Sequence, residues 1–182
     1  EYTKNNLMTR FDSLSKEFDE NIYPKETAFW GSEPNPGVDN DPRITILFED
    51  LRKDNGGYFD STNLFPKSIL VESNEREMII VSISVLGDDY EKTFIAHEFQ
   101  HLISFNQKEL IQHVEEGVWL NELRSEYASA VVGYDSEPQS GLKRRIQTFL
   151  EKPSDSLTEW PNTPNDYAEV ALFGRYLVDQ YG

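Results

Sequence analysis

The character of the chain changes at Gly87, and this change limits the fold class more than any other feature of the sequence. Before it, short apolar runs have the length and composition of strands, at residues 44–48, 68–71 and 78–85. After it, apolar residues recur at helical spacing over 89–107, 119–132, 142–151 and 166–180. Strands that precede helices, instead of alternating with them, predict an α+β protein.

The N-terminal part adds one helix and two breaks to this pattern. Residues 4–20 carry apolar side chains at helical spacing and predict an amphipathic helix. Residues 31–37 are rich in Gly and Pro and predict a loop, and residues 55–57 predict a turn. A chain of 182 residues fits a single domain. We expect that domain to have an N-terminal α/β lobe at about 1–110 and a helical lobe at about 111–182.

Charge and cysteine content exclude several classes of function. The formal net charge of −16 repels phosphate backbones, so nucleic acid is not an expected partner. The chain has no Cys, which excludes disulfides, thiol nucleophiles and cysteine-based zinc sites. No stretch has the roughly 18 apolar residues that a membrane span needs. We expect a monomer that is secreted or on the cell surface, with any leader absent from this chain, which begins at Glu1 instead of Met.

The most informative motif is H-E-x-x-H, formed by His97, Glu98 and His101 within a predicted helix. Two His four residues apart lie one turn above the other on the same face of a helix. Both imidazoles can therefore reach one zinc ion at ~2.0–2.1 Å. Glu98 follows the first His and can point its carboxylate at water on the metal. The motif predicts a zinc site in which Glu98 acts on water and does not bind the metal.

A third ligand is needed, and the downstream sequence offers one. Metzincins continue the motif as H-E-x-x-H-x-x-G-x-x-H, but Ser104 and Gln107 stand at the later Gly and His positions, which excludes that class. Glu122 and Glu126 lie four residues apart on the next predicted helix and share one face. Glu122 can complete a three-ligand site with water in the fourth position. Glu126 can accept the free ring N–H of a ligand His and fix its tautomer.

Together, H-E-x-x-H and the N-E-x-x-S-E segment from Asn121 to Glu126 resemble the gluzincin peptidases, the clan of thermolysin and the zinc aminopeptidases. Within that clan the chain is most similar to the bacterial hyicolysin-like family, and the likeness spans roughly residues 20–182. The matching segments are Gly57-Tyr58-Phe59, Ser73-Asn74-Glu75, residues 97–105 and residues 119–128. The chain departs from these relatives at Leu123-Arg124, where they often have Gly after the ligand, and Arg124 adds a cation that could alter specificity or pair with an acid.

The resemblance implies a zincin-like fold, a mixed β-sheet lobe with the active-site helix followed by a helical lobe, with one catalytic zinc between them. It also implies a peptidase that acts on peptides or proteins, and we expect an endopeptidase in which Glu98 is the general base. Residues 78–86 would then bind an extended substrate by pairing at the edge of the sheet. The alternatives are an aminopeptidase, a catalytically inactive zinc-fold binding or adhesion domain, and a metalloenzyme with a non-peptide substrate. No G-x-M-E-N-type anchor for a substrate amine supports the aminopeptidase.

Peptide hydrolysis of this kind also needs a donor for the developing oxyanion. Tyr167 is the candidate, because residues 167–177 resemble the helix that carries a catalytic Tyr in zinc aminopeptidases. His113, the third His of the chain, is the alternative proton donor. Residues 38–41 loosely resemble a calcium loop but lack the Gly and the distal Glu of an EF-hand, so calcium is only a secondary alternative as a cofactor.

Overall fold

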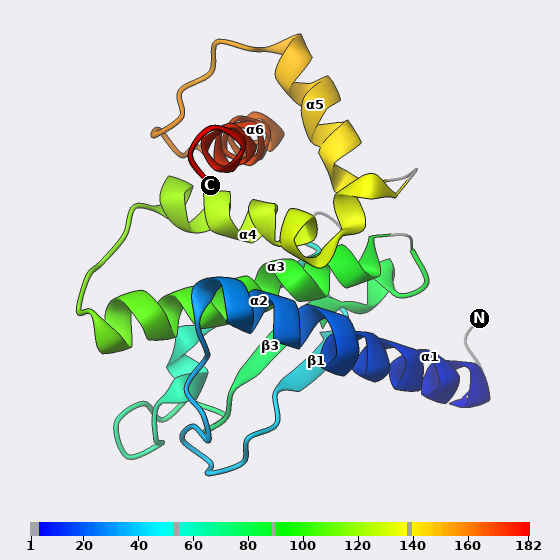
Figure 1. Cartoon of the computed structure of the whole chain (residues 1–182). Coiled ribbons are helices and arrows are strands. Elements are labelled where there is room, and N and C mark those ends of the chain that lie inside the picture. The colour runs from blue at the N-terminus through cyan, green and yellow to red at the C-terminus, as the bar shows by residue number, and fades with distance from the viewer. Residues whose placement is uncertain (1–3, 53–54, 89, 138–139) are drawn as a thin grey trace.

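The computed structural model describes residues 4–52, 55–88, 90–137 and 140–182, and these confirm an α+β fold (Figure 1). A small sheet and the N-terminal helices lie on one side of the long helix α3, and α4, α5 and α6 lie on the other side (Figure 1). The elements are α1 (Lys4–Glu17), α2 (Tyr23–Trp30), β1 (Thr45–Glu49), β2 (Gly57–Tyr58), β3 (Met78–Ser82), α3 (Glu91–Ser104), α4 (Val118–Val132), α5 (Gly141–Glu151) and α6 (Pro164–Tyr181). Short turns of other helical types join them: η1 (Phe18–Ile22), η2 (Ser61–Leu64), η3 (Ile83–Val85), η4 (Phe105–Ile111) and η5 (Tyr134–Ser136). This arrangement of a small sheet and a mostly helical remainder is compatible with a zincin-like fold. No helix within the described residues is long and apolar enough to cross a membrane.

The N-terminal helix is longer than the sequence predicted. The predicted helix over 4–20 continues through the π-helical turn η1 into α2, which ends at Trp30. Leu14, Phe18 and Ile22 are all buried, so the apolar spacing of four residues continues past the predicted end. A π turn absorbs one extra residue without ending a helix, and Pro is tolerated in the first turn of α2.

The sheet has a central strand, β3, which corrects the prediction for residues 78–86. Among the described residues the strand order is β1-β3-β2, with β1 parallel to β3 and β2 antiparallel to it. All five residues of β3 are buried, because neighbours cover both its edges and other elements cover its faces. The prediction that this strand offers a free edge to substrate is therefore wrong. The outer strand nearest α3 is β2, which contacts that helix.

Two other strand predictions need correction. Residues 68–71 form a turn and not a strand, with the backbone N–H groups of Ile69 and Leu70 both bonded to the carbonyl of Pro66. Ile69 and Val71 remain 66% and 79% exposed, and no strand among the described residues pairs with this turn. The strand predicted over 78–85 ends at Ser82, where the side chain accepts the N–H of Ser84 and starts η3.

The remaining helix boundaries differ by a few residues from prediction. The helix predicted over 89–107 starts at Glu91, after a turn at Tyr90, and becomes π-helical after Ser104; residue 89 lies outside the described part. The last helix begins at Pro164, earlier than the predicted 166, because Thr163 and Asp166 form a capping box and Pro at the first helical position suits a helix start.

The core packing sets the rotation of α3 about its own axis. Ile95, Phe99 and Leu102 are completely buried and pack into the main hydrophobic core. Phe99 contacts the aromatic rings of Phe18 and Tyr23 from the N-terminal helices. Because these apolar side chains turn toward the sheet and the N-terminal helices, the opposite side of α3 faces α4.

Glu26, on α2, is a fully buried carboxyl group whose two oxygens have no hydrogen-bond donor among the described residues. Burial raises the pKa of Glu26 well above its ordinary value of 4.5, because a charged carboxylate is poorly solvated there. The folded state therefore holds this proton more tightly than the unfolded state. Between pH 4.5 and the folded-state pKa, stability is lost as the pH rises.

We expect Glu26→Gln to gain stability relative to wild type as the pH rises above 4.5, by up to about 1.4 kcal/mol per pH unit. Urea unfolding of both proteins at several pH values measures the difference. Gln keeps the size of the side chain but cannot ionise. A stability difference that stays constant from acidic to neutral pH would contradict a buried, neutral Glu26.

Candidate metal centre

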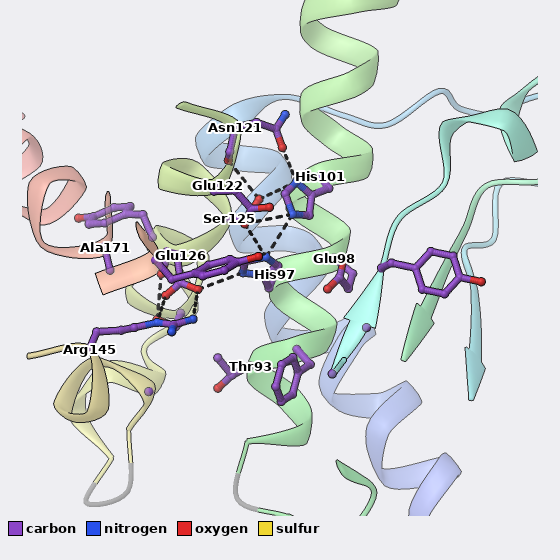
Figure 2. A pocket seen from close by; sticks show the side chains of 18 of the residues that line it. Thr93, His97, Glu98, His101, Asn121, Glu122, Ser125, Glu126, Arg145 and Ala171 are labelled. Carbon is purple, nitrogen blue, oxygen red and sulfur yellow. Dashed lines mark hydrogen bonds and ion pairs between the residues drawn. The ribbon is translucent and has the colours of Figure 1, made fainter. Parts of the chain in front are cut away.

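Helices α3 and α4 bring three potential metal ligands together at the floor of a cleft (Figure 2). His97 Nε2 lies 3.1 Å from His101 Nε2 and 3.2 Å from Glu122 Oε2. His101 Nε2 lies 3.7 Å from the same carboxylate oxygen. Among the described residues, no other group of three or more His, Asp or Glu side chains brings its possible ligand atoms within 4.8 Å of one another.

This triangle of donor atoms fits a zinc ion. Ligands at ~2.0–2.1 Å from zinc in tetrahedral geometry lie roughly 3.3–3.4 Å from one another, close to the separations of His97, His101 and Glu122. Glu122 Oε2 is buried and accepts no hydrogen bond from the described residues, although it points at both imidazoles. Two nitrogens and one oxygen are a ligand set that zinc accepts.

The orientation of the His101 ring is fixed by two residues of α4. Asn121 Oδ1 and Ser125 Oγ both bond to His101 Nδ1, the hydroxyl at 3.0 Å. Ser125 donates its own proton to Gln100 Oε1, so its oxygen is free to accept from His101. The proton of His101 is then on Nδ1, which leaves the Nε2 lone pair for the metal. Neither Asn121 nor Ser125 had a predicted role, although both are fixed letters of the N-E-x-x-S-E motif.

A second pair of residues lies behind His97. His97 Nδ1 is 3.7 Å from Glu126 Oε1, which is an ion-pair separation and longer than a hydrogen bond. Arg145, from α5, donates to both oxygens of Glu126 at 2.8 and 2.5 Å. The Arg145 guanidinium also lies over the ring of Tyr167, 4.9 Å from its centroid. No sequence pattern pointed to Arg145, because its contact with Glu126 depends on how α5 packs.

Charges around the two imidazoles act in opposite directions. Burial lowers the pKa of His97, but the carboxylates of Glu122, Glu98 and Glu126 outweigh burial and raise it to about 9. Burial and the proximity of His97 lower the pKa of His101 to about 4. A metal ion that binds here has to displace the proton on His97, so binding weakens as the pH falls.

Glu98 lies beside the three ligand residues but faces the sheet (Figure 2). Its carboxyl group is buried and accepts the backbone N–H of Phe59, next to β2. Burial raises the pKa of Glu98 to about 7, and the charges of Glu122 and Glu126 act in the same direction. A Cβ on Gly57 would lie 2.8 Å from the carbonyl oxygen of Ile80 and 3.0 Å from Glu98, so only Gly allows this approach.

The cleft above these residues has a volume of about 1100 Å³ and is lined by β2, α3, α4, α5 and α6. Tyr167 lines it, with its hydroxyl donating to Asn162 Oδ1 at 3.0 Å and its ring against Trp160. His113 does not line it and is exposed on the loop before α4. The structure therefore places Tyr167, and not His113, at the wall of the cleft.

Arg124 is not among the residues that line the cleft. Its guanidinium pairs with Glu116 and donates to Ser104 Oγ at 3.2 Å. Of the two roles considered for this residue in the sequence analysis, the contacts show the pairing with an acid.

We expect Glu126→Ala to lower zinc affinity by ~10–100-fold without abolishing the site, because His97 loses the carboxylate behind its ring. Arg145→Gln is expected to change affinity in the same direction but less, because Glu126 remains and only its position is freed. Competition with a chromophoric chelator measures both. Arg144→Gln, at the exposed neighbour on α5, is the matched control. Unchanged zinc affinity in both test variants would show that Glu126 and Arg145 form an ion pair with no effect on the metal site.

Comparison with known proteins gives one informative similarity. The chain is 30% identical over 192 aligned residues to the neutral metalloprotease ShpI of Staphylococcus hyicus. The alignment covers 92% of this chain but only 42% of ShpI, so the chain spans less than half of that relative. No family model matches the chain, and no solved structure matches it. The similarity supports a metallopeptidase family for the chain.

Proposed function

We propose that this chain is a zinc-dependent peptidase of the gluzincin type, related to the hyicolysin-like enzymes, that cleaves internal peptide bonds. The observation that carries the proposal is the triangle of His97, His101 and Glu122 beside a separate buried carboxyl group, Glu98, in an open cleft. Similarity to a neutral metalloprotease supports the same class of reaction.

His97, His101 and Glu122 would hold the zinc, which would supply a Lewis acid that polarises the scissile carbonyl and acidifies water. Glu98 would accept a proton from the attacking water and deliver it to the leaving amine. A pKa of about 7 suits both transfers at neutral pH, because the group can take up a proton and give it back. Asn121 and Ser125 would keep the His101 ring in the ligating orientation.

An extended substrate would lie along β2 and not along β3. Gly57 and Tyr58 form the outer strand of the sheet and line the cleft next to Glu98. Main-chain pairing with this outer edge would place a peptide between the sheet and the ligand helices.

The cleft favours an endopeptidase over an aminopeptidase. Besides Glu98 and Glu122, the acids that line the cleft are Glu109, which is exposed, and Glu126 and Asp135, which are already paired with Arg145 and Arg175. Paired carboxylates are poor anchors for the free amine of a substrate N-terminus, because the new cation would compete with an existing one.

Digestion of a peptide blocked at both ends tests the proposal. The zinc-loaded protein should cleave it internally, 1,10-phenanthroline should stop cleavage, and added zinc should restore it. Mass spectrometry of the products locates the cleaved bond. Full zinc loading without cleavage of blocked or unblocked peptides would favour a binding domain, and stepwise loss of residues from unblocked peptides alone would favour an aminopeptidase.

Tyr167→Phe is expected to lower kcat by ~10²–10³-fold, because the oxyanion would lose a hydroxyl donor while the ring keeps its packing. Zinc content, thermal stability and KM should stay near wild type, because the hydroxyl acts mainly in the transition state. Steady-state kinetics beside His113→Ala measures the effect. If Tyr167→Phe keeps wild-type activity and His113→Ala loses most of it, His113 is the oxyanion donor and Tyr167 is not.

If both variants are active, Tyr127 becomes the next candidate donor, because it also lines the cleft. Tyr134 is a weaker candidate, because its hydroxyl is buried and donates to Glu17 at 2.7 Å.

A further inference from the structure

The cleft carries more positive charge than the composition of this acidic chain suggests. Among the described residues that line it, four are arginines and none is a lysine: Arg52, Arg144, Arg145 and Arg175. The arginines at 145 and 175 already pair with acids of the cleft wall. No described carboxylate forms an ion pair with either of the other two, Arg52 and Arg144. The cleft therefore holds two guanidinium groups whose charge is not neutralised by the described chain.

Arg144 belongs to the end of the cleft where α3 begins. A Cβ on Gly141, in the first turn of α5, would lie 3.9 Å from Thr93 Cγ2, so α5 begins against the first turns of α3. Thr93 lies one helical turn before His97 (Figure 2). Glu109, the exposed acid of the cleft lining, follows α3 at its other end. The charge of the cleft therefore differs between its two ends, and the positive end is the one next to α5.

The guanidinium of Arg144 lies against an aromatic ring. Its central carbon is 5.1 Å from the centroid of the Tyr90 ring, and Tyr90 directly precedes α3. Both residues line the cleft. Stacking on a ring uses the flat face of a guanidinium and leaves the N–H groups at its edge for a carboxylate. The Tyr90 ring can thus orient Arg144 without occupying its hydrogen-bond donors.

Electrostatics at this end of the cleft favour a bound anion. Arg144 and Arg145 are adjacent on α5, and like charges repel, so an anion beside them is attracted by both. Glu126 offsets only Arg145. The first turn of α5 adds partial positive charge, because Gly141 and Leu142 of this turn also line the cleft. A carboxylate therefore meets a positive surface here, although the chain as a whole has a net charge of −16.

We propose that Arg144 binds a carboxylate of the substrate, so that the enzyme prefers peptides with Asp or Glu near the bond that it cleaves. This inference rests on the proposed peptidase function and adds a substrate class to it. Tyr90 precedes His97 by two helical turns, which is about 10 Å along the helix axis. An extended peptide covers that distance in about three residues. The acidic side chain is expected about three residues from the cleaved bond, on the side that lies toward α5.

Blocked peptides that differ only in one Glu or Gln test the proposal. Zinc-loaded wild type is assayed on two series in which Glu or Gln occupies each position on both sides of the cleaved bond. At the favoured position, kcat/KM should be about 3–10-fold higher for Glu than for Gln. The difference should lie mainly in KM, because Arg144 holds the carboxylate equally in the ground state and the transition state. Added salt should reduce the ratio by screening the charges.

Substitutions at the proposed site should change this ratio in a graded way. Arg144→Gln should bring it to about 1, since the guanidinium supplies the whole charge-assisted contact. Arg144→Lys should keep part of the preference, because the charge remains without the planar stacking on Tyr90. Arg76→Gln, at an exposed arginine outside the cleft, is the matched control and should keep the wild-type ratio. Zinc content is measured for each variant, so that loss of metal is not mistaken for loss of substrate binding.

Binding without turnover separates this inference from the proposed function. In the zinc-loaded Glu98→Gln background, fluorescence anisotropy should show about 3–10-fold tighter binding of the Glu peptide than of the Gln peptide. Adding Arg144→Gln should remove the difference. Preferential binding through Arg144 by a protein that cleaves neither peptide would refute the peptidase function and keep the carboxylate site.

The free C-terminus of a short peptide is a second source of a carboxylate. Gln peptides with a free or an amidated C-terminus about three residues after the cleaved bond distinguish it from an acidic side chain. A preference for the free C-terminus that Arg144→Gln removes, without any preference for Glu, would assign Arg144 to the peptide terminus and overturn the preference for acidic side chains.

Three other results would contradict the role of Arg144. The first is equal kcat/KM and equal affinity for Glu and Gln peptides at every position. The second is a Glu preference that persists in Arg144→Gln, and its loss in Arg52→Gln would move the site to the loop between β1 and β2. The third is a preference that Arg76→Gln removes as well, which would show a general effect of protein charge.

Discussion

Zinc-loaded Glu98→Gln protein is expected to keep its metal and lose ~10²–10⁴-fold or more of its peptidase turnover. Glu98 is not one of the three clustered donor residues, so removing its charge leaves the metal ligands in place. Gln has nearly the same size and keeps an oxygen that can accept the Phe59 N–H. It cannot take a proton from water at neutral pH, so proton transfer is the step that fails.

The measurement pairs zinc content by elemental analysis with initial rates on a blocked peptide. Glu72→Gln is the matched control, because it makes the same chemical change at an exposed position. The pH profile of wild type should show a limb near the Glu98 pKa, and this limb should be absent from any residual activity of the variant. Retained turnover in a fully zinc-loaded Glu98→Gln protein would refute the assigned role.

Glu122→Ala is expected to lose most of its bound zinc and, with it, all measurable hydrolysis. The change leaves two imidazoles on one helix, and two ligands hold zinc far more weakly than three. Loss should be similar for His97→Ala and His101→Ala, because each also removes one corner of the donor triangle. Elemental analysis after dialysis against metal-free buffer measures the effect.

The fold should survive this substitution, because Glu122 contributes no buried apolar surface to the main core. Circular dichroism checks that point, and Glu115→Ala, at an exposed acid before α4, is the control. Full zinc occupancy in Glu122→Ala would mean that another residue is the third ligand. Hydrolysis by metal-free Glu122→Ala would contradict a metal-dependent reaction altogether.

The sequence was informative where chemistry depends on neighbours within one helix. The positions of His97 and His101 follow from helical spacing, and the structure brings their Nε2 atoms to 3.1 Å from each other. Glu122 and Glu126 were selected by the same reasoning on the next helix, and both face His97. The α+β class followed from the change of pattern at Gly87, because strand and helix periods differ along the chain itself.

The sequence was misleading where an apolar run had no local partner. Residues 68–71 have strand-like composition but form a turn, and within the part of the chain that the structure describes no strand pairs with them. Residues 78–82 do form a strand, but composition could not show that β1 and β2 flank it on both sides. Strand order is a property of pairing between distant segments, and this is why the substrate edge was assigned to β3 instead of β2.

The sequence by itself determined the α+β class, the helix that carries His97 and His101, and the acids that could join them, because each follows from spacing within one element. Only the tertiary structure decided which groups surround these residues. Arg145 reaches Glu126 from α5, Gly57 lets β2 approach Glu98, and the backbone N–H of Val38 donates to Glu77 from a loop much earlier in the chain. The physical reason is that helix spacing is set by backbone hydrogen bonds within one segment. These contacts depend instead on how segments far apart in the sequence pack together, and the residues of one segment do not show which other segment it will meet.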